Sequence, residues 1–327
     1  MNAFEQKITM IIPIIKNDFC RMSWDFRIFF SCLPIHKIVF IGPAELEAEV
    51  REVASNKADK YDVSFLNENE LIEYKRVQDF LKSQLTKWGY GIAENSRPGW
   101  YYQQYLKMEY SMICEDEYYL TWDADTIPLH RIDLFDADGI PYLDVKAEYC
   151  KDYFITIKRM LGLEKSHENS FISEHMLFSK KWMLELIEEL DQTHYEGERY
   201  YEKIFAAMGA DNIKRGFSEF ETYGTWILNR HPSDYHIREW KSLRKGGVFF
   251  EIDKLTSEDR KWLGESFDAI SFEKYHPYMM EWAELFQNQQ FRQTMRADEI
   301  YEMVIKSGVF GKYENGMIRV GEDLWPV

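Results

Sequence analysis

The sequence predicts an α/β fold in which helices flank a doubly wound, mostly parallel sheet. Two observations carry this prediction. Short apolar runs rich in β-branched residues alternate with helical stretches over residues 1–125, an order typical of parallel strands joined by crossover helices. Hydrophobic residues make up 45% of the 327 residues and aromatic residues 16%. The chain can therefore fill a large core.

Strands and helices are predicted to alternate through the first part of the chain. The run ITMIIPII is short, apolar and β-branched, which predicts a buried strand, and HKIVFIGP ends on a Gly-Pro breaker. Together the predicted strands lie at residues 8–15, 36–43, 61–69 and 118–122. The predicted helices span residues 18–32, 45–56 and 70–87, and a further helix begins near residue 100.

The second half of the chain has a less regular pattern. A short strand running into an amphipathic helix is predicted over residues 171–190, and two more strands at 247–252 and 267–272. Further helices are predicted over residues 198–208, 277–291 and 297–306, and a loop followed by a helix over residues 217–232. No linker rich in Gly, Ser or Pro forces a domain boundary. We therefore expect one domain with two halves, residues 1–130 and 131–275, and a helical C-terminal extension over residues 276–327.

The charge balance and the missing motifs exclude several classes of protein. The net charge is −16, whereas a general nucleic-acid binder normally has a basic face. The same acidity argues against broad electrostatic attachment to an anionic membrane. No GxGxxG follows the first strand, and the chain has no GxxxxGK[ST] or GxSxG. Dinucleotide, P-loop and serine-hydrolase interpretations therefore lack their motifs.

The cysteines and the apolar run near the N-terminus indicate where in the cell the protein is expected. None of the four cysteines forms a CxxC pair, so a zinc site built on cysteines is not expected. The apolar run at residues 8–15 contains Pro13 and is far shorter than the roughly 20 residues of a membrane helix. No signal peptide is visible. We expect a cytoplasmic protein with free thiols, with peripheral association at the inner face of the membrane left open.

The segment YYLTWDADTIPL, residues 118–129, ends an apolar strand on two carboxylates, Asp123 and Asp125. Residues i and i+2 of a strand point the same way, so both carboxylates can be aimed at one place. Hard cations such as Mg²⁺ take oxygen ligands, commonly one or two carboxylates together with substrate phosphates. The alternative is a solvated, Asp-rich turn in which Asp125 caps a turn or helix.

The order of the motifs resembles that of GT-A-type glycosyltransferases, which use nucleotide-sugar donors, and more narrowly of bacterial enzymes that build surface polysaccharides. The resemblance covers about two thirds of the chain and rests on five segments: IIPIIKND (11–18), RPGWYYQQYLKM (97–108), YYLTWDADTIPL, SFISEHMLFSK (170–180) and FSEFETYG (217–224). It implies that residues 1–130 bind the nucleotide sugar and residues 131–275 bind the acceptor. It also implies a Mn²⁺ or Mg²⁺ cofactor, a UDP-linked donor and a glycan or lipid-linked glycan as acceptor.

The resemblance also assigns residues to the donor and the metal. Asp125, helped by Asp123, would hold the metal, with a late histidine as a further ligand, for which His276 is preferred to His231. The donor site implied is formed by Pro13, Lys16, Asp18, Arg97, Gln104, Lys107 and Asp123.

Several of these residues have structural alternatives. A helix from residue 100 places Gln104 and Lys107 on one polar strip of an otherwise apolar helix. Lys107 could therefore simply extend from a core helix to solvent. Asp18 could cap a helix, and each histidine could be a structural residue.

Candidate residues for the acceptor half come from two segments. Sugar transfer with inversion needs a base for the acceptor hydroxyl, and Glu219 and Glu221 at a predicted helix start are the candidates. Ser218 and Glu221 match a capping box, which leaves Glu219 as the preferred base. The resemblance places Glu174 and His175 in the acceptor or donor-sugar pocket, whereas a hydrogen-bonded structural histidine is the alternative.

Two rival functions remain open. DADTI also resembles the motif of haloacid-dehalogenase-like phosphatases, with Asp123 as nucleophile and Asp125 as acid, but there the motif follows the first core strand and here three predicted strands precede it. A non-catalytic carbohydrate- or protein-binding module is the other rival. The 10 Trp and 21 Tyr residues could supply stacking platforms, although their spread along the chain suits core packing better.

Overall fold

A five-stranded sheet organises the fold. The computed structural model describes residues 6–57, 60–90, 97–147, 150–274, 276–310, 312–314, 317–320 and 323–326. The strands, in spatial order, are β3 (Asp62–Asn67), β2 (Lys37–Gly42), β1 (Ile8–Pro13), β4 (Tyr118–Trp122) and β7 (His175–Ser179). The first four are parallel and β7 runs antiparallel to β4. The predicted class, a mostly parallel α/β sheet flanked by helices, is confirmed.

The strands are apolar throughout because both faces of the sheet are covered. Along β1, Met10 and Ile12 pack into one hydrophobic core, whereas Ile11 packs into a second core on the opposite face. In β4 the same alternation places Tyr119 in one core and Leu120 in the other. This side-chain alternation is why a continuous run such as ITMIIP forms a central strand.

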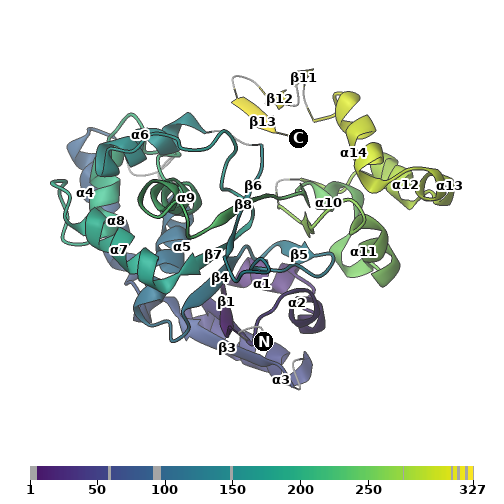
Figure 1. Ribbon diagram of the computed structural model, residues 1–327, viewed down its shortest axis with the longest axis horizontal. Coiled ribbons are helices and arrows are strands. Elements are labelled where there is room, and N and C mark those ends of the chain that lie inside the picture. Colours follow the sequence, from purple (N-terminus) through teal and green to yellow (C-terminus); the bar gives the residue numbers. More distant parts are fainter. Residues whose placement is uncertain are drawn as a thin grey trace.

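The two cores are closed by different sets of helices, which lie on opposite sides of the sheet in Figure 1. One set comprises α4 (Tyr74–Lys87), α5 (Pro98–Glu109), α6 (Lys151–Leu161), α7 (Lys180–Asp191), α8 (Tyr200–Met208) and α9 (Glu219–Arg230). The other comprises α1 (Lys16–Arg21), α2 (Phe26–Cys32), α3 (Glu47–Lys57), α10 (Gly246–Phe249), α11 (Ser257–Leu263), α12 (Met280–Gln287), α13 (Gln289–Thr294) and α14 (Ala297–Lys306).

Three smaller sheets complete the described chain. One contains β5 (Thr126–Pro128), β10 (Ala269–Ser271) and β9 (Ser242–Leu243), and another pairs β6 (Tyr142–Val145) with β8 (His236–Glu239). An antiparallel sheet of β11 (Lys312–Glu314), β12 (Met317–Val320) and β13 (Asp323–Pro326) follows the expected C-terminal helices. Short 3₁₀ turns lie at Ala44–Leu46, Glu68–Glu70, Tyr110–Met112 and Ile252–Lys254.

Three predicted elements differ from the structure. The helix predicted over residues 18–32 is divided into α1 and α2, because the indole of Trp24 turns inward between them and donates to the Phe19 carbonyl. The strand predicted at 247–252 is wrong: α10 and a 3₁₀ turn occupy it. A Cβ at Gly246 would lie 2.3 Å from the Ile270 side chain, so glycine permits this close approach to β10. The helix predicted over 277–291 breaks at Asn288, whose side chain caps α13.

Other elements had no counterpart in the sequence prediction. Helices α6 and α11, the short strands β5, β6, β8 and β9, and the C-terminal sheet β11–β13 were not predicted. Within the described residues, no helix combines the length and the apolar character needed to cross a membrane.

Candidate functional site

The candidate site lies where the strand order of the main sheet reverses. The chain passes outward from β1 to β2 and β3, and then returns to place β4 on the other side of β1. In open α/β sheets, ligands bind beyond the carboxyl ends of the strands at such a switch point. Asp123 and Asp125 follow the carboxyl end of β4, and α1, which carries Asp18, follows the carboxyl end of β1.

The backbone of Asp123 is fixed by the neighbouring strand. Its N–H donates to the carbonyl of Glu174 over 2.8 Å, and its own carbonyl accepts from Thr126 over 3.1 Å. These bonds extend the β4–β7 pairing, in which Trp122 lies opposite His175. Glu174 has a φ of 60°, a left-handed conformation that costs energy for a non-glycine residue. The antiparallel strand β7 therefore determines where the first aspartate points.

A buried lysine joins the aspartate pair to the helix that carries the predicted base. The Nζ atom of Lys107 donates to Asp123 Oδ1 and to Glu219 Oε1, each over 2.8 Å. The Lys107 side chain is 4% exposed. Burial disfavours its charge, but the carboxylates of Asp123 and Glu219 outweigh that effect and raise the pKa of Lys107 above its usual value. Lys107 is therefore a fixed positive charge beside Asp123.

The polar strip predicted on α5 lies against the N-terminus of α9. The Oε1 atom of Gln104 accepts a hydrogen bond from the Glu219 N–H over 3.1 Å. Gln104 and Lys107 thus both contact Glu219 from a helix that is otherwise buried among apolar residues. Arg97 precedes α5 with a φ of 40° and stacks over Trp100 at 5.9 Å. The side chain of Arg97 is exposed.

The two glutamates at the start of α9 have different surroundings. Burial raises the pKa of Glu219, although Lys107 opposes the shift. The Glu221 carboxylate accepts a hydrogen bond from Ser170, while its N–H donates to Ser218 Oγ over 3.3 Å. Ser218 is thus the helix N-cap, as its sequence position predicts.

Asp125 lies among other negative charges. Burial, followed by the nearby carboxylates of Asp123 and Glu273, raises the pKa of Asp125 to about 7, against a smaller opposing effect of Arg21. An ionised carboxylate in such surroundings lacks a compensating charge.

Charged residues that the sequence reading missed surround this aspartate. Arg21 pairs with Asp18 over 3.5 Å and donates to the Phe272 carbonyl. Arg244 donates to Glu273 over 2.5 Å, and His276, the predicted late ligand, approaches the same glutamate at 3.2 Å. Arg244 and Glu273 belong to no spacing motif, and only the fold brings them to the end of β4.

Glu273 has the opposite electrostatic balance to Asp125. Burial alone would raise its pKa, but the close approach of His276 and the charge of Arg244 outweigh burial and lower the pKa of Glu273 to about 2. Glu273 therefore stays ionised at neutral pH, and its negative charge contributes to the raised pKa of Asp125.

Three other predicted residues have their own contacts within the protein. Pro13 is buried in β1, opposite Ile41. Lys16 is exposed and pairs with Glu49. His231, the less preferred metal candidate, stacks on Trp182 with ring centroids 3.5 Å apart and belongs to the α7–α9 side of the molecule.

Glu174 and His175 are both bound within the protein. The Glu174 carboxylate accepts from Lys146 and, over 2.9 Å, from the Trp240 indole. Burial raises its pKa, but the charges of Lys146 and Arg244 outweigh burial, so the pKa of Glu174 lies below its usual value. His175 is 2% exposed and contacts Asp144 Oδ2 over 2.9 Å.

The oxygen-rich end of β4 suits a hard cation only in part. Among the described residues, no group of three or more His, Cys, Asp or Glu side chains is arranged to hold a metal ion. Asp125 nevertheless offers hard oxygen donors in surroundings of excess negative charge. Mg²⁺ commonly binds through one or two carboxylates and completes its shell with substrate phosphates and water. The residues therefore fit a cation that is bound together with a phosphate-bearing ligand.

The fold is that of an α/β protein with a cluster of charged residues at the switch point of its sheet. The chain belongs to the family described as "Family of unknown function (DUF6492)", whose model matches residues 5–304. No match was found among curated proteins. Among solved structures, the chain is similar to mouse xyloside xylosyltransferase 1 in its apo form, with 15% identity and a TM-score of 0.41, over 83% of this chain and 99% of that chain.

Proposed function

We propose that this protein is a metal-dependent glycosyltransferase that moves a sugar from a nucleotide-diphosphate donor, UDP-linked in our proposal, to a hydroxyl of a glycan acceptor. The observation that carries the proposal is the uncompensated carboxylate of Asp125 beside the Lys107–Asp123 ion pair at the switch point. A cation bound to the donor phosphates would neutralise the Asp125 carboxylate, and Lys107 supplies a buried positive charge. The wider role, again proposed, is cytoplasmic synthesis of bacterial surface polysaccharide on a glycan or lipid-linked acceptor.

Asp125 and Asp123 are the proposed metal ligands. A bound Mn²⁺ or Mg²⁺ would neutralise charge on the donor diphosphate and stabilise it as a leaving group. His276 is a proposed third contributor, because it lies beside Glu273, which in turn acts on Asp125. Lys107 orients Asp123 by holding one of its oxygens.

The donor itself would lie over the carboxyl ends of β1 and β4. We propose that Pro13, Lys16 and Asp18 lie along the nucleotide. Arg97, which precedes α5, would add positive charge. Gln104 would act on the donor site indirectly, because its side chain accepts a hydrogen bond from the N-terminus of α9.

Glu219 is the proposed base for transfer with inversion. The acceptor hydroxyl would lose its proton to the glutamate while its oxygen bonds to the anomeric carbon, and the bond from that carbon to the diphosphate oxygen breaks. One oxygen of Glu219 is bound to Lys107 and the side chain is 5% exposed, so the acceptor must approach the other oxygen. Inverted product configuration supports this role, and retained configuration removes the need for such a base.

Glu221, Glu174 and His175 receive supporting roles in the proposal. Glu221 holds Ser170, and Glu174 positions Asp123 through its carbonyl. His175 packs between Trp122 and Trp240, with ring centroids at 5.1 and 4.2 Å. These three residues would shape the acceptor side from within the protein.

A thermal-shift panel tests the proposal. The panel contains nucleoside mono- and diphosphates and nucleotide sugars, each with and without Mn²⁺. A ligand that binds only the native state raises the melting temperature, and we expect the largest rise for a nucleoside diphosphate with Mn²⁺. No shift with any nucleotide contradicts the proposal. Phosphate-ester hydrolysis that requires Asp123, without nucleotide binding, would favour the phosphatase alternative instead.

A further inference from the structure

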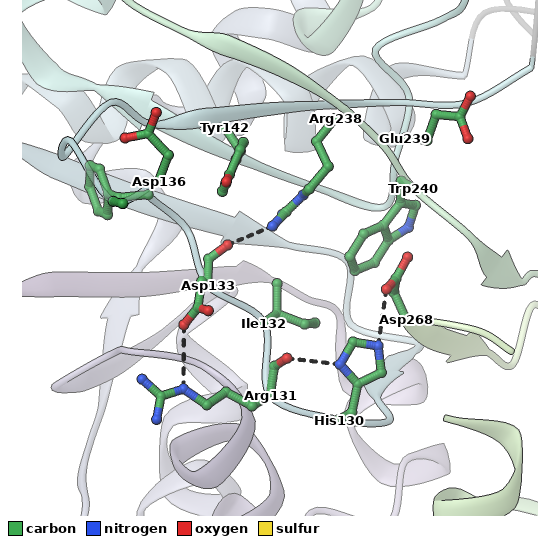
Figure 2. A pocket seen from close by; sticks show the side chains of 12 residues that line it. His130, Arg131, Ile132, Asp133, Asp136, Tyr142, Arg238, Glu239, Trp240 and Asp268 are labelled. Atoms are coloured by element: carbon green, nitrogen blue, oxygen red, sulfur yellow. Dashed lines mark hydrogen bonds and ion pairs between the residues drawn. The ribbon is translucent and has the colours of Figure 1, made fainter. Parts of the chain in front are cut away.

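A cavity opens between the loop that follows β5 and the β6–β8 sheet. Its volume is about 550 Å³. The walls come from the loop after β5, from β6 and β8, and from Asp268 before β10 (Figure 2). Tyr142, Arg238 and Trp240 line one side of the cavity, and His130 and Asp133 line another. None of the residues proposed above for donor or metal lines it.

The charges around this cavity disfavour a phosphate-bearing ligand. Four carboxylate side chains and two arginines line it. Both arginines are already paired, Arg131 with Asp133 over 3.3 Å and Arg238 with Asp144 over 2.6 Å. An anion would therefore meet a surplus of negative charge. The end of β4 differs in containing a buried cation, Lys107.

The cavity combines aromatic surface with hydrogen-bonding groups in fixed positions. The Arg238 guanidinium stacks on the Tyr142 ring at 4.2 Å. It donates twice to Asp144 and once, over 2.7 Å, to the Asp133 carbonyl. A guanidinium has five N–H groups, so these contacts account for three of them. The carboxylates of Asp133 and Glu239 are exposed at the cavity and can accept hydrogen bonds from hydroxyl groups.

One wall connects the cavity to the candidate site. Trp240 lines the cavity, and its indole N–H donates to Glu174, whose carbonyl fixes Asp123. Arg238, which also lines the cavity, donates to Asp144, and Asp144 contacts His175, the residue after Glu174. A ligand in the cavity would thus contact Trp240, whose indole binds Glu174, the residue that fixes the backbone of Asp123.

We propose that this cavity binds an uncharged sugar unit. Hydroxyl groups can pair with carboxylates and guanidinium N–H groups, and the C–H faces of a sugar can pack on aromatic rings, whereas a neutral ligand avoids the repulsion that an anion would meet. Resting on the function proposed above, the inference makes the sugar a part of the acceptor. The acceptor glycan is therefore uncharged at this position.

Saturation-transfer NMR tests the proposal directly, without nucleotide or metal. The probes are methyl glycosides of glucose, galactose, mannose, N-acetylglucosamine and xylose, with glucose 1-phosphate as the charged counterpart. We expect saturation transfer to at least one glycoside and none to the sugar phosphate. The variant Asp133→Ala/Glu239→Ala should bind the glycoside at least tenfold more weakly than the unmodified protein does.

The control variant, Glu251→Ala/Glu258→Ala, removes the same charge from a separate 340 Å³ cavity and should bind the glycoside as the unmodified protein does. The proposal is overturned if no glycoside receives saturation, if glucose 1-phosphate binds equally well, or if both variants weaken binding alike. Because nucleotide is absent, failure here leaves the nucleotide panel unaffected, and failure of that panel leaves a positive glycoside result standing.

Discussion

Lys107 pairs with two carboxylates of the candidate site. It is buried between Asp123 and Glu219, and removing one member of a buried ion pair leaves an uncompensated charge. The sequence pointed to this lysine as a phosphate contact or as a core residue reaching solvent. The structure shows instead that it bridges two carboxylates, and any contact with a ligand has to share it with them.

Lys107→Met is expected to destabilise the protein by about 3–5 kcal/mol, the range typical of a broken buried ion pair. Urea unfolding at neutral pH measures this effect. Adding Glu219→Gln to Lys107→Met should recover part of the loss, because one of the two unpaired carboxylates is then gone. If both variants unfold at the same urea concentration as the unmodified protein, Lys107 does not hold the site together.

Asp125 should oppose folding at neutral and alkaline pH. Its pKa in the folded protein, about 7, lies above the ordinary 3.8, so the folded state binds the proton more tightly than the unfolded state. The free energy of unfolding therefore falls as pH rises from about 4 to about 7, and the loss is complete above that range.

Asp125→Asn removes this penalty, so the variant should be more stable than the unmodified protein at pH 8, by on the order of 1 kcal/mol because the side chain is partly exposed. The difference should vanish near pH 4. Urea unfolding in EDTA at both pH values gives the comparison. Equal stability at pH 8 would show that Asp125 carries no such penalty.

At the level of elements, α9 packs closely against the segment before β7. Gly224 in α9 allows this approach, since a Cβ there would lie 2.3 Å from the Phe171 ring. Alanine favours a helix over glycine by about 1 kcal/mol, but a clash with a buried ring costs more.

Gly224→Ala is therefore expected to lower stability by about 1–3 kcal/mol despite its better helix propensity. Gly99→Ala in α5 is the matched control, because its Cβ would meet only the Tyr74 hydroxyl at 3.9 Å, and it should be neutral or stabilising. Thermal denaturation of the two variants decides the point. A stabilised Gly224→Ala protein would mean that α9 can move away from Phe171 at little cost.

Elements set by local pattern were predictable, whereas those set by distant contacts were not. The strands β1–β4 and the helix α5 follow from apolar runs and breakers in the sequence. Helix α10 was predicted as a strand because its aromatic run resembles one, and its close approach to Ile270 is a distant contact that no local pattern indicates. The break between α1 and α2 likewise depends on Trp24 packing onto Phe40.

The site was predictable to a similar extent. Asp123 and Asp125 follow the end of a strand as the sequence predicts, but Ala124 and Asp125 form a turn and do not continue β4. The contact between Lys107 and Glu219 joins residues 112 positions apart, and no spacing rule pairs them. Arg244 and Glu273 reach Asp125 through β9 and β10, two short strands of which the sequence pattern indicated only the second.

At the scale of the whole molecule, a net charge of −16 coexists with two sites of different electrostatic character. The end of β4 combines a buried lysine with several carboxylates, where we propose that a cation and a diphosphate bind. The cavity beside β6 and β8 has an excess of carboxylates, and there we propose a neutral sugar. The sheet separates two cores, and its switch point lies where chain segments from both cores meet.

We propose that Asp125 binds a nucleoside diphosphate through a divalent cation. Isothermal titration of UDP into the unmodified protein, Asp125→Asn and the exposed control Asp79→Asn, each with Mn²⁺ and with EDTA, measures this binding. We expect binding with Mn²⁺ for the unmodified and control proteins, and at least tenfold weaker binding in EDTA or with Asp125→Asn. Binding of equal strength in all conditions, or no binding in any, would contradict it.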